Sequence, residues 1–182
     1  MTWRPVWASG DALNLRVEAT DTRAGTRYRV RTGSPSPTLG ADGAVVLCLR
    51  GGRELVVVEQ ERVGLGLRLW ELPRGAADAD DADLVATGLR ELCEETGIAA
   101  AEGTVLGGVH PDSGVLGTTV AVVLVHVDAA ASATADGVEV DAARWVPLDA
   151  LPGLVARGEL RDGISLAALA LLWAQPPGGA TG

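Results

Sequence analysis

The residues best suited to chemistry in this sequence are three glutamates within five positions. Glu91, Glu94 and Glu95 stand at i, i+3 and i+4, so a helix through them places their carboxylates on one face. Like charges at this spacing repel, and the arrangement costs stability unless a cation lies among them. Magnesium binds carboxylate oxygens together with water and substrate phosphates. The spacing therefore predicts a divalent-cation site, although a solvated acidic helix face would show the same charges.

A helix over residues 84–96 is expected to carry these glutamates. Leucines recur through it at helical spacing, and Gly97 follows where helices commonly end. Arg90 lies four positions before Glu94, so it is expected to orient the carboxylates or to neutralise them in part.

Short strands are expected to make up most of the remaining chain. Apolar and polar residues alternate between 11 and 32 around a turn at 21–25, which predicts an N-terminal β-hairpin. Two runs rich in β-branched residues, 44–49 and 54–59, flank Arg50-Gly51-Gly52-Arg53 and predict a second hairpin. The other expected elements are strands at 68–72, 105–109, 118–127 and 144–146, and helices at 149–157 and 164–173.

This order of elements predicts an α/β fold, a sandwich of helices around a mixed β-sheet. The prolines of Ser34-Pro35-Ser36-Pro37 forbid regular strand pairing and indicate a boundary. We expect an N-terminal β extension at 1–38, a main domain at 39–175 and a flexible tail at 176–182.

Composition and charge narrow the classes of function. The chain has 182 residues, a net charge of −9 and 47% apolar residues. No basic face for nucleic acid is visible, and an acidic enzyme with an anionic substrate needs cations between the two. No signal peptide or membrane span is expected, so the predicted location is the cytoplasm. Cys48 and Cys93 lie in apolar patterns and are expected to be small buried side chains.

Residues Gly75 to Ile98 resemble the Nudix box, whose pattern is G-x5-E-x7-R-E-U-x-E-E-x-G-U with U an aliphatic residue. Its second half matches at every fixed position, namely Arg90, Glu91, Leu92, Glu94, Glu95, Gly97 and Ile98. The first half departs: Gly75 lies fifteen residues before Arg90 instead of fourteen, and the expected glutamate falls on Ala82. Asp81 or Asp83 is the expected substitute. The resemblance implies a Nudix hydrolase with the α/β/α sandwich of that family.

The flanking segments are similar to those of ADP-ribose pyrophosphatases within this family. The similarity covers roughly residues 43–173 and rests on Glu59-Gln60-Glu61-Arg62, on Trp70 to Gly75 and on Gly158 to Gly163. The N-terminal strands fit the extra sheet by which those enzymes often dimerise. The resemblance thus implies a nucleoside diphosphate sugar as substrate and a homodimer.

The family's metal ligands map onto the glutamate segment. Glu91 and Glu95 match the principal ligands, Glu94 matches a further ligand or a water-orienting position, and Gly75 matches a backbone carbonyl ligand. Two or three Mg²⁺ ions are implied with substrate, and Mn²⁺ is an alternative.

Three residues before the box are expected to bind substrate. Arg62 matches an arginine that contacts the substrate's phosphate or sugar end, and Arg74 is placed to reach a phosphate. Glu71 is expected beside the ligands or the substrate. For each of the three, a surface role at a strand end is the alternative.

The general base is expected in the acidic loop Asp136-Gly137-Val138-Glu139. Glu139 matches best by its distance from the following strand, and it could serve as base, as metal ligand or as a solvent-facing residue. Glu94, Glu139 and Arg90 are the expected catalytic set. His110-Pro111-Asp112-Ser113-Gly114 replaces the subgroup's usual Ser-Pro-Gly-x-Ser-x-Glu segment, so His110 and Asp112 are either ligand contacts or parts of a turn.

The expected activity is Mg²⁺-dependent hydrolysis of the diphosphate bond of a nucleoside diphosphate derivative, with ADP-ribose giving AMP and ribose 5-phosphate. One alternative is a Nudix hydrolase of another nucleotide, such as an oxidised nucleoside triphosphate, a dinucleoside polyphosphate or another nucleotide sugar. The other is a Nudix-shaped sensor that binds a nucleotide without cutting it.

Overall fold

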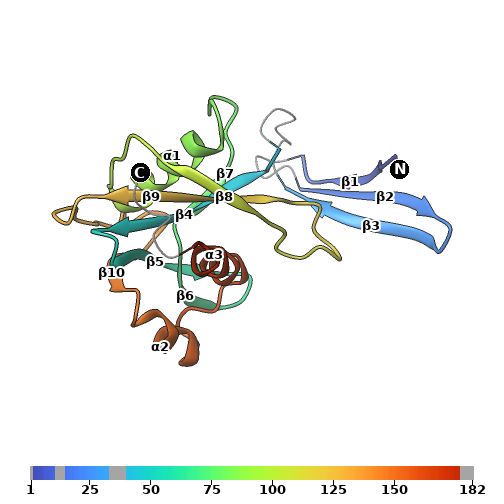
Figure 1. Ribbon diagram of the computed structural model, residues 1–182. Helices are drawn as coiled ribbons and strands as arrows, with labels where there is room; N and C mark the ends of the chain where they lie inside the picture. The colour runs from blue at the N-terminus through green and yellow to red at the C-terminus, as the bar shows by residue number, and fades with distance from the viewer. Residues whose placement is uncertain (1, 11–14, 33–39, 177–182) are drawn as a thin grey trace.

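The chain forms two β-sheets and three helices in a computed structural model, which describes residues 2–10, 15–32 and 40–176. The N-terminal sheet is antiparallel, with the order β1 (Arg4–Ala8), β2 (Arg16–Thr22) and β3 (Gly25–Arg31). It extends away from the rest of the molecule (Figure 1). The expected hairpin is present as β2 and β3. Strand β1 was not predicted, because its five residues are all exposed and show no alternation of buried and exposed positions.

The second sheet is mixed and carries the rest of the strands. Within the described residues its order is β10-β5-β4-β9-β8, with β6 pairing β5 and β7 pairing β4. Strands β4 and β9 run parallel, and the other pairs are antiparallel. The strands are β4 (Gly43–Arg50), β5 (Glu54–Arg62), β6 (Leu67–Glu71), β7 (Arg74–Ala76), β8 (Thr104–Val109), β9 (Val120–Val127) and β10 (Ala142–Pro147).

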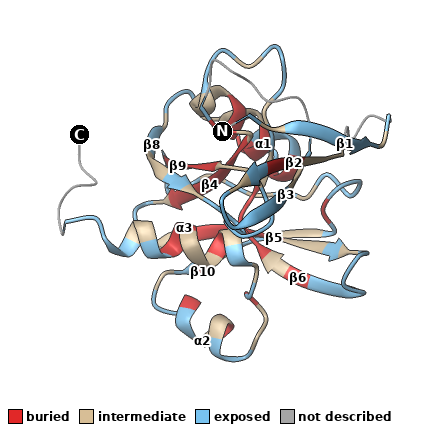
Figure 2. Ribbon diagram, turned by 90° about the vertical axis from the view of Figure 1, so that its right-hand side faces the viewer, coloured by how far each residue is buried: buried red, intermediate tan, exposed pale blue. Residues whose placement is uncertain are grey.

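Helices cover both faces of this sheet. Side chains alternate across β4, so Val45 and Leu47 belong to a core that includes Leu169 of α3 (Gly163–Trp173). Val46 belongs to a second core that includes Leu92 of α1 (Leu84–Thr96). The short helix α2 (Leu151–Ala156) adds to the first core. Buried segments concentrate where these layers meet (Figure 2), and the predicted α/β/α sandwich with a mixed sheet is confirmed.

Strands β4 and β5 separate as they leave their turn, and this opens the sheet beside α1. They pair next to the turn, at Leu49 and Arg50, whereas the start of β4 pairs with β7 at residues 43–45. The Val46 N–H donates to the Pro73 carbonyl at 2.9 Å, which continues the contact. Strand β7 was expected as loop, because it has three residues, follows a proline and contains a glycine. It brings Gly75 against α1.

The N-terminal sheet is joined to the main sheet through β3. The Val30 N–H donates to the Val115 carbonyl at 2.8 Å, and the Gly117 N–H donates to the Val30 carbonyl at 3.0 Å. Arg31 forms an ion pair with Asp42, which also accepts a hydrogen bond from the Thr119 N–H at 2.8 Å. The loop after β8 therefore supports the first sheet. The expected proline break at 34–37, the boundary at 38 and the tail from 177 onward lie outside the described residues.

The two cysteines differ in burial. Cys48 is buried as predicted, but the prediction for Cys93 is wrong, since it is exposed on the outer side of α1. Leu92 and Glu95 occupy the inner side, so the apolar pattern around Cys93 did not reveal its direction.

Among the helices that the structure describes, each is too short or too polar to span a bilayer.

Candidate active site

Helix α1 is held at both ends, which fixes the direction of its glutamates. The Asp83 carboxylate accepts a hydrogen bond from the Ala86 N–H at 2.8 Å and caps the first turn. Gly97 adopts a φ of 67°, and its N–H donates to the Cys93 carbonyl at 2.8 Å. A left-handed residue at this position favours glycine and ends the helix. The predicted helix boundaries are confirmed.

The three glutamates of α1 have different environments. Glu91 is 6% exposed and Glu95 is 2% exposed, on the face that packs toward the sheet. Glu94 points outward, with a side chain that is 57% exposed. Two of the carboxylates therefore form a buried pair, and the third lies at its solvent edge.

Burial makes this pair electrostatically unfavourable without a cation. The pKa of Glu95 is raised to about 8, chiefly by burial and also by the charges of Glu91 and Glu139, while the hydrogen bond from the Arg74 N–H opposes the shift. Burial also raises the pKa of Glu91 against the opposing effect of Arg90. In the part of the chain that the structure describes, the hydrogen bond of the Glu95 carboxylate comes from the Arg74 N–H at 3.2 Å. A buried carboxylate with so little compensation fits a bound cation.

Gly75 lies directly against the buried pair. A Cβ built on this residue would be 2.1 Å from Oε1 of Glu91, far inside van der Waals contact. With the Glu91 carboxylate in this position, glycine lets the β7 backbone approach it this closely, and a side chain here would displace the carboxylate. The structure thus places Gly75 against Glu91.

Arg90 donates hydrogen bonds to oxygen atoms of neighbouring residues. It donates to Glu91 at 2.8 Å, to Glu94 at 2.9 Å and to the Ala76 carbonyl at 2.8 Å. Its Nε and Nη2 also donate to the two carboxylate oxygens of Asp81, at 3.2 and 3.1 Å. These bonds raise the pKa of Arg90, with the Asp81 bond as the largest cause. Arg90 therefore ties the helix to the loop before it and orients two of the glutamates.

Asp81 takes the position that the sequence left open between two aspartates. Its side chain is 7% exposed and accepts a further hydrogen bond from Thr87 Oγ1 at 2.9 Å. Asp83, the other candidate, caps α1 instead. Of the two aspartates beside Ala82, Asp81 is thus the one that contacts Arg90.

Replacing Asp81 with Ala should weaken both the fold and the site. Arg90 would lose its bidentate partner, so we expect unfolding to become easier by about 1–3 kcal/mol. Catalytic turnover should fall roughly 10- to 100-fold, because the residue that orients Glu91 and Glu94 is released. Thermal unfolding and kcat measure the two effects. The exposed neighbour Asp80 provides the control, and equal losses in Asp80→Ala would contradict the assignment.

A second charged network lies beside the first. Glu71 is 1% exposed and receives two hydrogen bonds from Arg62, of which the Nε bond is 2.8 Å. It receives two more from Arg74, from Nη2 at 2.9 Å and from Nε at 3.3 Å. Arg74 also reaches Asp162 at 3.4 Å. The bond to Glu71 raises the pKa of Arg62. Glu71 therefore holds both expected substrate arginines and is itself covered by them.

Asp162 and Ser165 complete this network and were not among the predicted site residues. Asp162 caps α3 by accepting from the Ser165 N–H at 2.8 Å and from Ser165 Oγ at 2.9 Å. Ser165 Oγ accepts in turn from the Leu72 N–H at 3.0 Å. A polar residue directly before an apolar helix was the available signal. Its link to Arg74, 88 positions away along the chain, was not readable from the sequence.

Two cavities adjoin the network, and Arg74 lines both. One has a volume of about 640 Å³ and lies between the end of the β5–β6 hairpin and the start of α3. Its lining includes Arg62, Glu71, Arg74 and Arg161. The other has a volume of about 280 Å³ and is lined by Gly75, Val30 and Leu116 among others.

The loop that carries Glu139 is ordered by Asp136. The Asp136 carboxylate accepts hydrogen bonds from the N–H groups of Val138 at 3.0 Å, Glu139 at 3.1 Å and Val140 at 3.1 Å. The Glu139 side chain is exposed, yet its charge raises the pKa of both Glu91 and Glu95. The structure thus brings Glu139 into electrostatic range of the buried pair.

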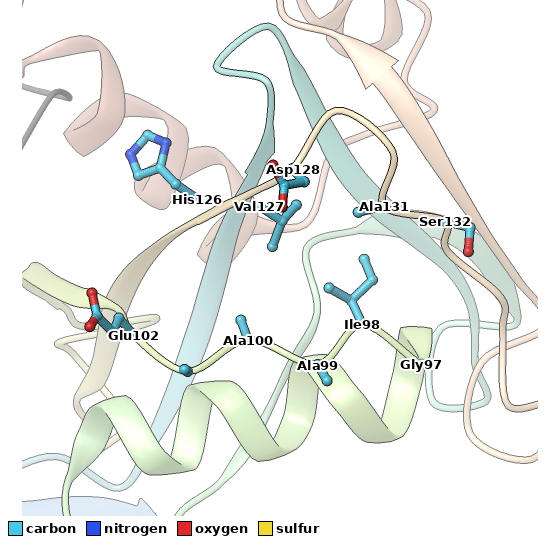
Figure 3. A pocket seen from close by; sticks show the side chains of 11 residues that line it. Gly97, Ile98, Ala99, Ala100, Glu102, His126, Val127, Asp128, Ala131 and Ser132 are labelled. Carbon is cyan, nitrogen blue, oxygen red and sulfur yellow. The ribbon is translucent and has the colours of Figure 1, made fainter.

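The other residues considered in the sequence make local contacts. His110 Nδ1 lies 3.3 Å from Thr119 Oγ1, and Asp112 accepts from the Gly114 N–H at 2.9 Å within its own turn. A separate cavity of about 570 Å³ lies between the loop that follows α1 and the end of β9 (Figure 3). Ile98 and Ala131 line this cavity, which contains no residue of either charged network.

The donor set is suited to a cation that takes only a few protein ligands. Among the described residues, no group of three or more His, Cys, Asp or Glu side chains is arranged to hold a metal ion. Glu91 and Glu95 form a pair, with the Gly75 backbone beside them. Magnesium commonly binds one or two carboxylates and completes its shell with water and substrate phosphates, so the residues fit this ion.

The layered fold and the acidic site at α1 are those of a Nudix-like protein. Comparisons with known proteins agree with this assignment. The family model of the NUDIX domain matches residues 40–169, so the chain belongs to the Nudix family of hydrolases. A solved structure of an ADP compounds hydrolase is similar in fold, with a TM-score of 0.66 and 17% identity over 95% of this chain and 93% of that chain. No curated protein matches the chain.

Proposed function

We propose that this protein hydrolyses the diphosphate bond of a nucleoside diphosphate derivative with the help of Mg²⁺. The observation that carries the proposal is the buried Glu91–Glu95 pair, which Arg74 links to an arginine-lined cavity. ADP-ribose, cut by water to AMP and ribose 5-phosphate, is the substrate we favour. The likeness to an ADP compounds hydrolase supports this choice.

Glu91 and Glu95 are the proposed metal ligands, with Glu94 at the solvent edge and the Gly75 carbonyl as further ligands. Mn²⁺ would suit the same oxygens, and two or three ions would be bound once substrate phosphates complete the site. The bound ions supply charge neutralisation at the diphosphate and make water more acidic. Arg90, held by Asp81, keeps Glu91 and Glu94 in place.

Glu139 is the proposed general base. Its carboxylate would take the proton from the water that attacks phosphorus. Its exposed side chain, on a loop fixed by Asp136, leaves it free to approach the substrate. The effect of its charge on the pKa of Glu91 and Glu95 supports its place beside the reaction, as base or as an additional ligand.

Arg62 and Arg74 are the proposed substrate arginines, and Glu71 positions both. The charges of these two arginines are nearly balanced, because Glu71 and Asp162 offset them. The arginines are therefore pre-ordered, and little side-chain entropy is lost when they bind an anion.

A panel of diphosphate compounds with Mg²⁺ tests the proposal. We expect release of AMP and ribose 5-phosphate from ADP-ribose, and slower release from nucleoside triphosphates, dinucleoside polyphosphates and other nucleotide sugars. Tight binding of the panel compounds without any product would contradict hydrolysis and favour a nucleotide sensor. The contact of Asp81 with Arg90, next to the position of the missing box glutamate, supports the hydrolase over the sensor.

A homodimer assembled through the N-terminal sheet is also proposed. Val6, Trp7 and Tyr28 of this sheet are each more than half exposed, at 51%, 52% and 59%. Apolar side chains gathered on a projecting sheet are typical of a surface that meets a partner. Size-exclusion chromatography coupled to light scattering should give twice the chain mass, and a monomer would contradict this. We propose the cytoplasm as its location.

A further inference from the structure

One arginine of the larger cavity is left without an anionic partner. Arg62 and Arg74, which line the cavity of about 640 Å³, are both paired with Glu71. Arg161 lines the same cavity and is exposed. Across the described residues, no carboxylate forms an ion pair or hydrogen bond with Arg161. Glu61, a further acidic residue of the lining, pairs with Arg68, so Arg161 is the arginine of this lining that no described carboxylate pairs with.

The backbone position of Arg161 is fixed by the residues before and after it. Leu160 before it is fully buried in the core, and Asp162 after it caps α3 and contacts Arg74. The Arg161 backbone is therefore held between two anchored residues, while its side chain remains free at the cavity edge. In a protein with a net charge of −9, an unneutralised arginine at a cavity is suited to an anion.

Arg74 connects the cavity to the buried carboxylate pair. The Arg74 N–H contacts Glu95, and the guanidinium of the same residue reaches Asp162 beside Arg161. One arginine side chain therefore spans the distance between the proposed metal ligands and the cavity wall. A substrate whose one phosphate lies at the metals would extend its remaining part along this side chain.

Resting on the proposed function, we infer that Arg161 is a further substrate-binding residue. Its guanidinium binds an anionic oxygen on the part of the diphosphate substrate that lies beyond the metal-bound phosphate. Arg62 and Arg74 are already committed to carboxylates, so Arg161 supplies the unmatched positive charge. It therefore favours substrates that carry negative charge at that end.

The test compares wild type with Arg161→Ala and Arg161→Lys, using the most active diphosphate of the panel. The Ala variant should raise KM about 10- to 100-fold with kcat within about twofold, because a charge-assisted contact to the bound substrate is lost. The Lys variant should recover part of that loss, since it keeps the charge but not the fork of donors. The rise of KM with added NaCl should be shallower in the Ala variant.

Arg157→Ala is the matched control, because Arg157 is exposed and pairs with Glu159 outside this cavity. Its KM should equal that of wild type. An unchanged KM in Arg161→Ala, with an active wild type, would overturn the inference and leave the proposed function standing. Failure of wild type to turn over any compound of the panel would instead overturn both. A fall in kcat with constant KM would mark Arg161 as structural and also reject the inference.

Discussion

Replacing Glu95 with Gln should remove nearly all turnover, by about 10³-fold or more in kcat, while the protein remains folded. Glu95 is the most deeply buried carboxylate of α1, and Gln preserves its shape without its charge. The loss would therefore report the missing cation ligand instead of a packing defect. Steady-state rates with saturating Mg²⁺ measure the effect. Glu102→Gln, on the exposed loop after α1, is the control and should keep wild-type rates.

The same variant should change how stability depends on pH. Burial raises the pKa of Glu95 to about 8, so between pH 4.5 and 8 the folded protein holds a proton that the unfolded chain has lost. This contribution to stability is fully present below about pH 4.5 and is lost as the pH rises through 8. Metal-free wild type should thus lose stability between pH 6 and 9 relative to Glu95→Gln.

Magnesium should reverse this difference. The cation competes with the proton for the carboxylate, so its stabilisation of wild type should grow from pH 6 to pH 9. Glu95→Gln should show a smaller and flatter response. Thermal unfolding with EDTA and with Mg²⁺ across this pH range measures both effects. Parallel profiles for the two proteins would mean that Glu95 is not the group that holds the metal.

The parts of this site that could be predicted from the sequence are those encoded locally. The leucine spacing and Gly97 identify α1, and the i, i+3, i+4 spacing identifies its acidic residues. Spacing did not distinguish Glu94, which is exposed, from Glu91 and Glu95, which are buried. That difference depends on which side of the helix meets β4 and β7, and pairing between distant strands decides it.

The choice between Asp81 and Asp83 as the partner of Arg90 shows a second limit of prediction from the sequence. Asp81 and Asp83 are equally close to Ala82 in sequence, and an extra loop residue removes the register that would separate them. Their roles follow from geometry: Asp83 meets the first turn of α1, whereas Asp81 turns inward to Arg90. The contact between Arg74 and Asp162 was equally hidden, because their partnership forms only when α3 packs on the sheet.

Replacing Gly75 with Ala should abolish most activity with little effect on the fold. The new Cβ would lie 2.1 to 2.3 Å from the carboxyl atoms of Glu91, so the carboxylate has to move. Arg90 holds that carboxylate at 2.8 Å, and a displacement of about 1 Å at a reacting centre can cost 10²-fold in rate. We expect a fall of that size in kcat, and a melting temperature close to wild type.

Two comparisons make this prediction specific to the contact with Glu91. Gly107→Ala adds the same methyl group at ordinary van der Waals distance from Leu171, so it should leave activity unchanged. Glu91→Asp withdraws the carboxylate by one methylene and should be harmful alone. When Glu91→Asp is combined with Gly75→Ala, the further loss of kcat should be smaller, because the shorter aspartate no longer clashes with the new Cβ. Additive losses in kcat for the two changes would show that Gly75 acts independently of Glu91.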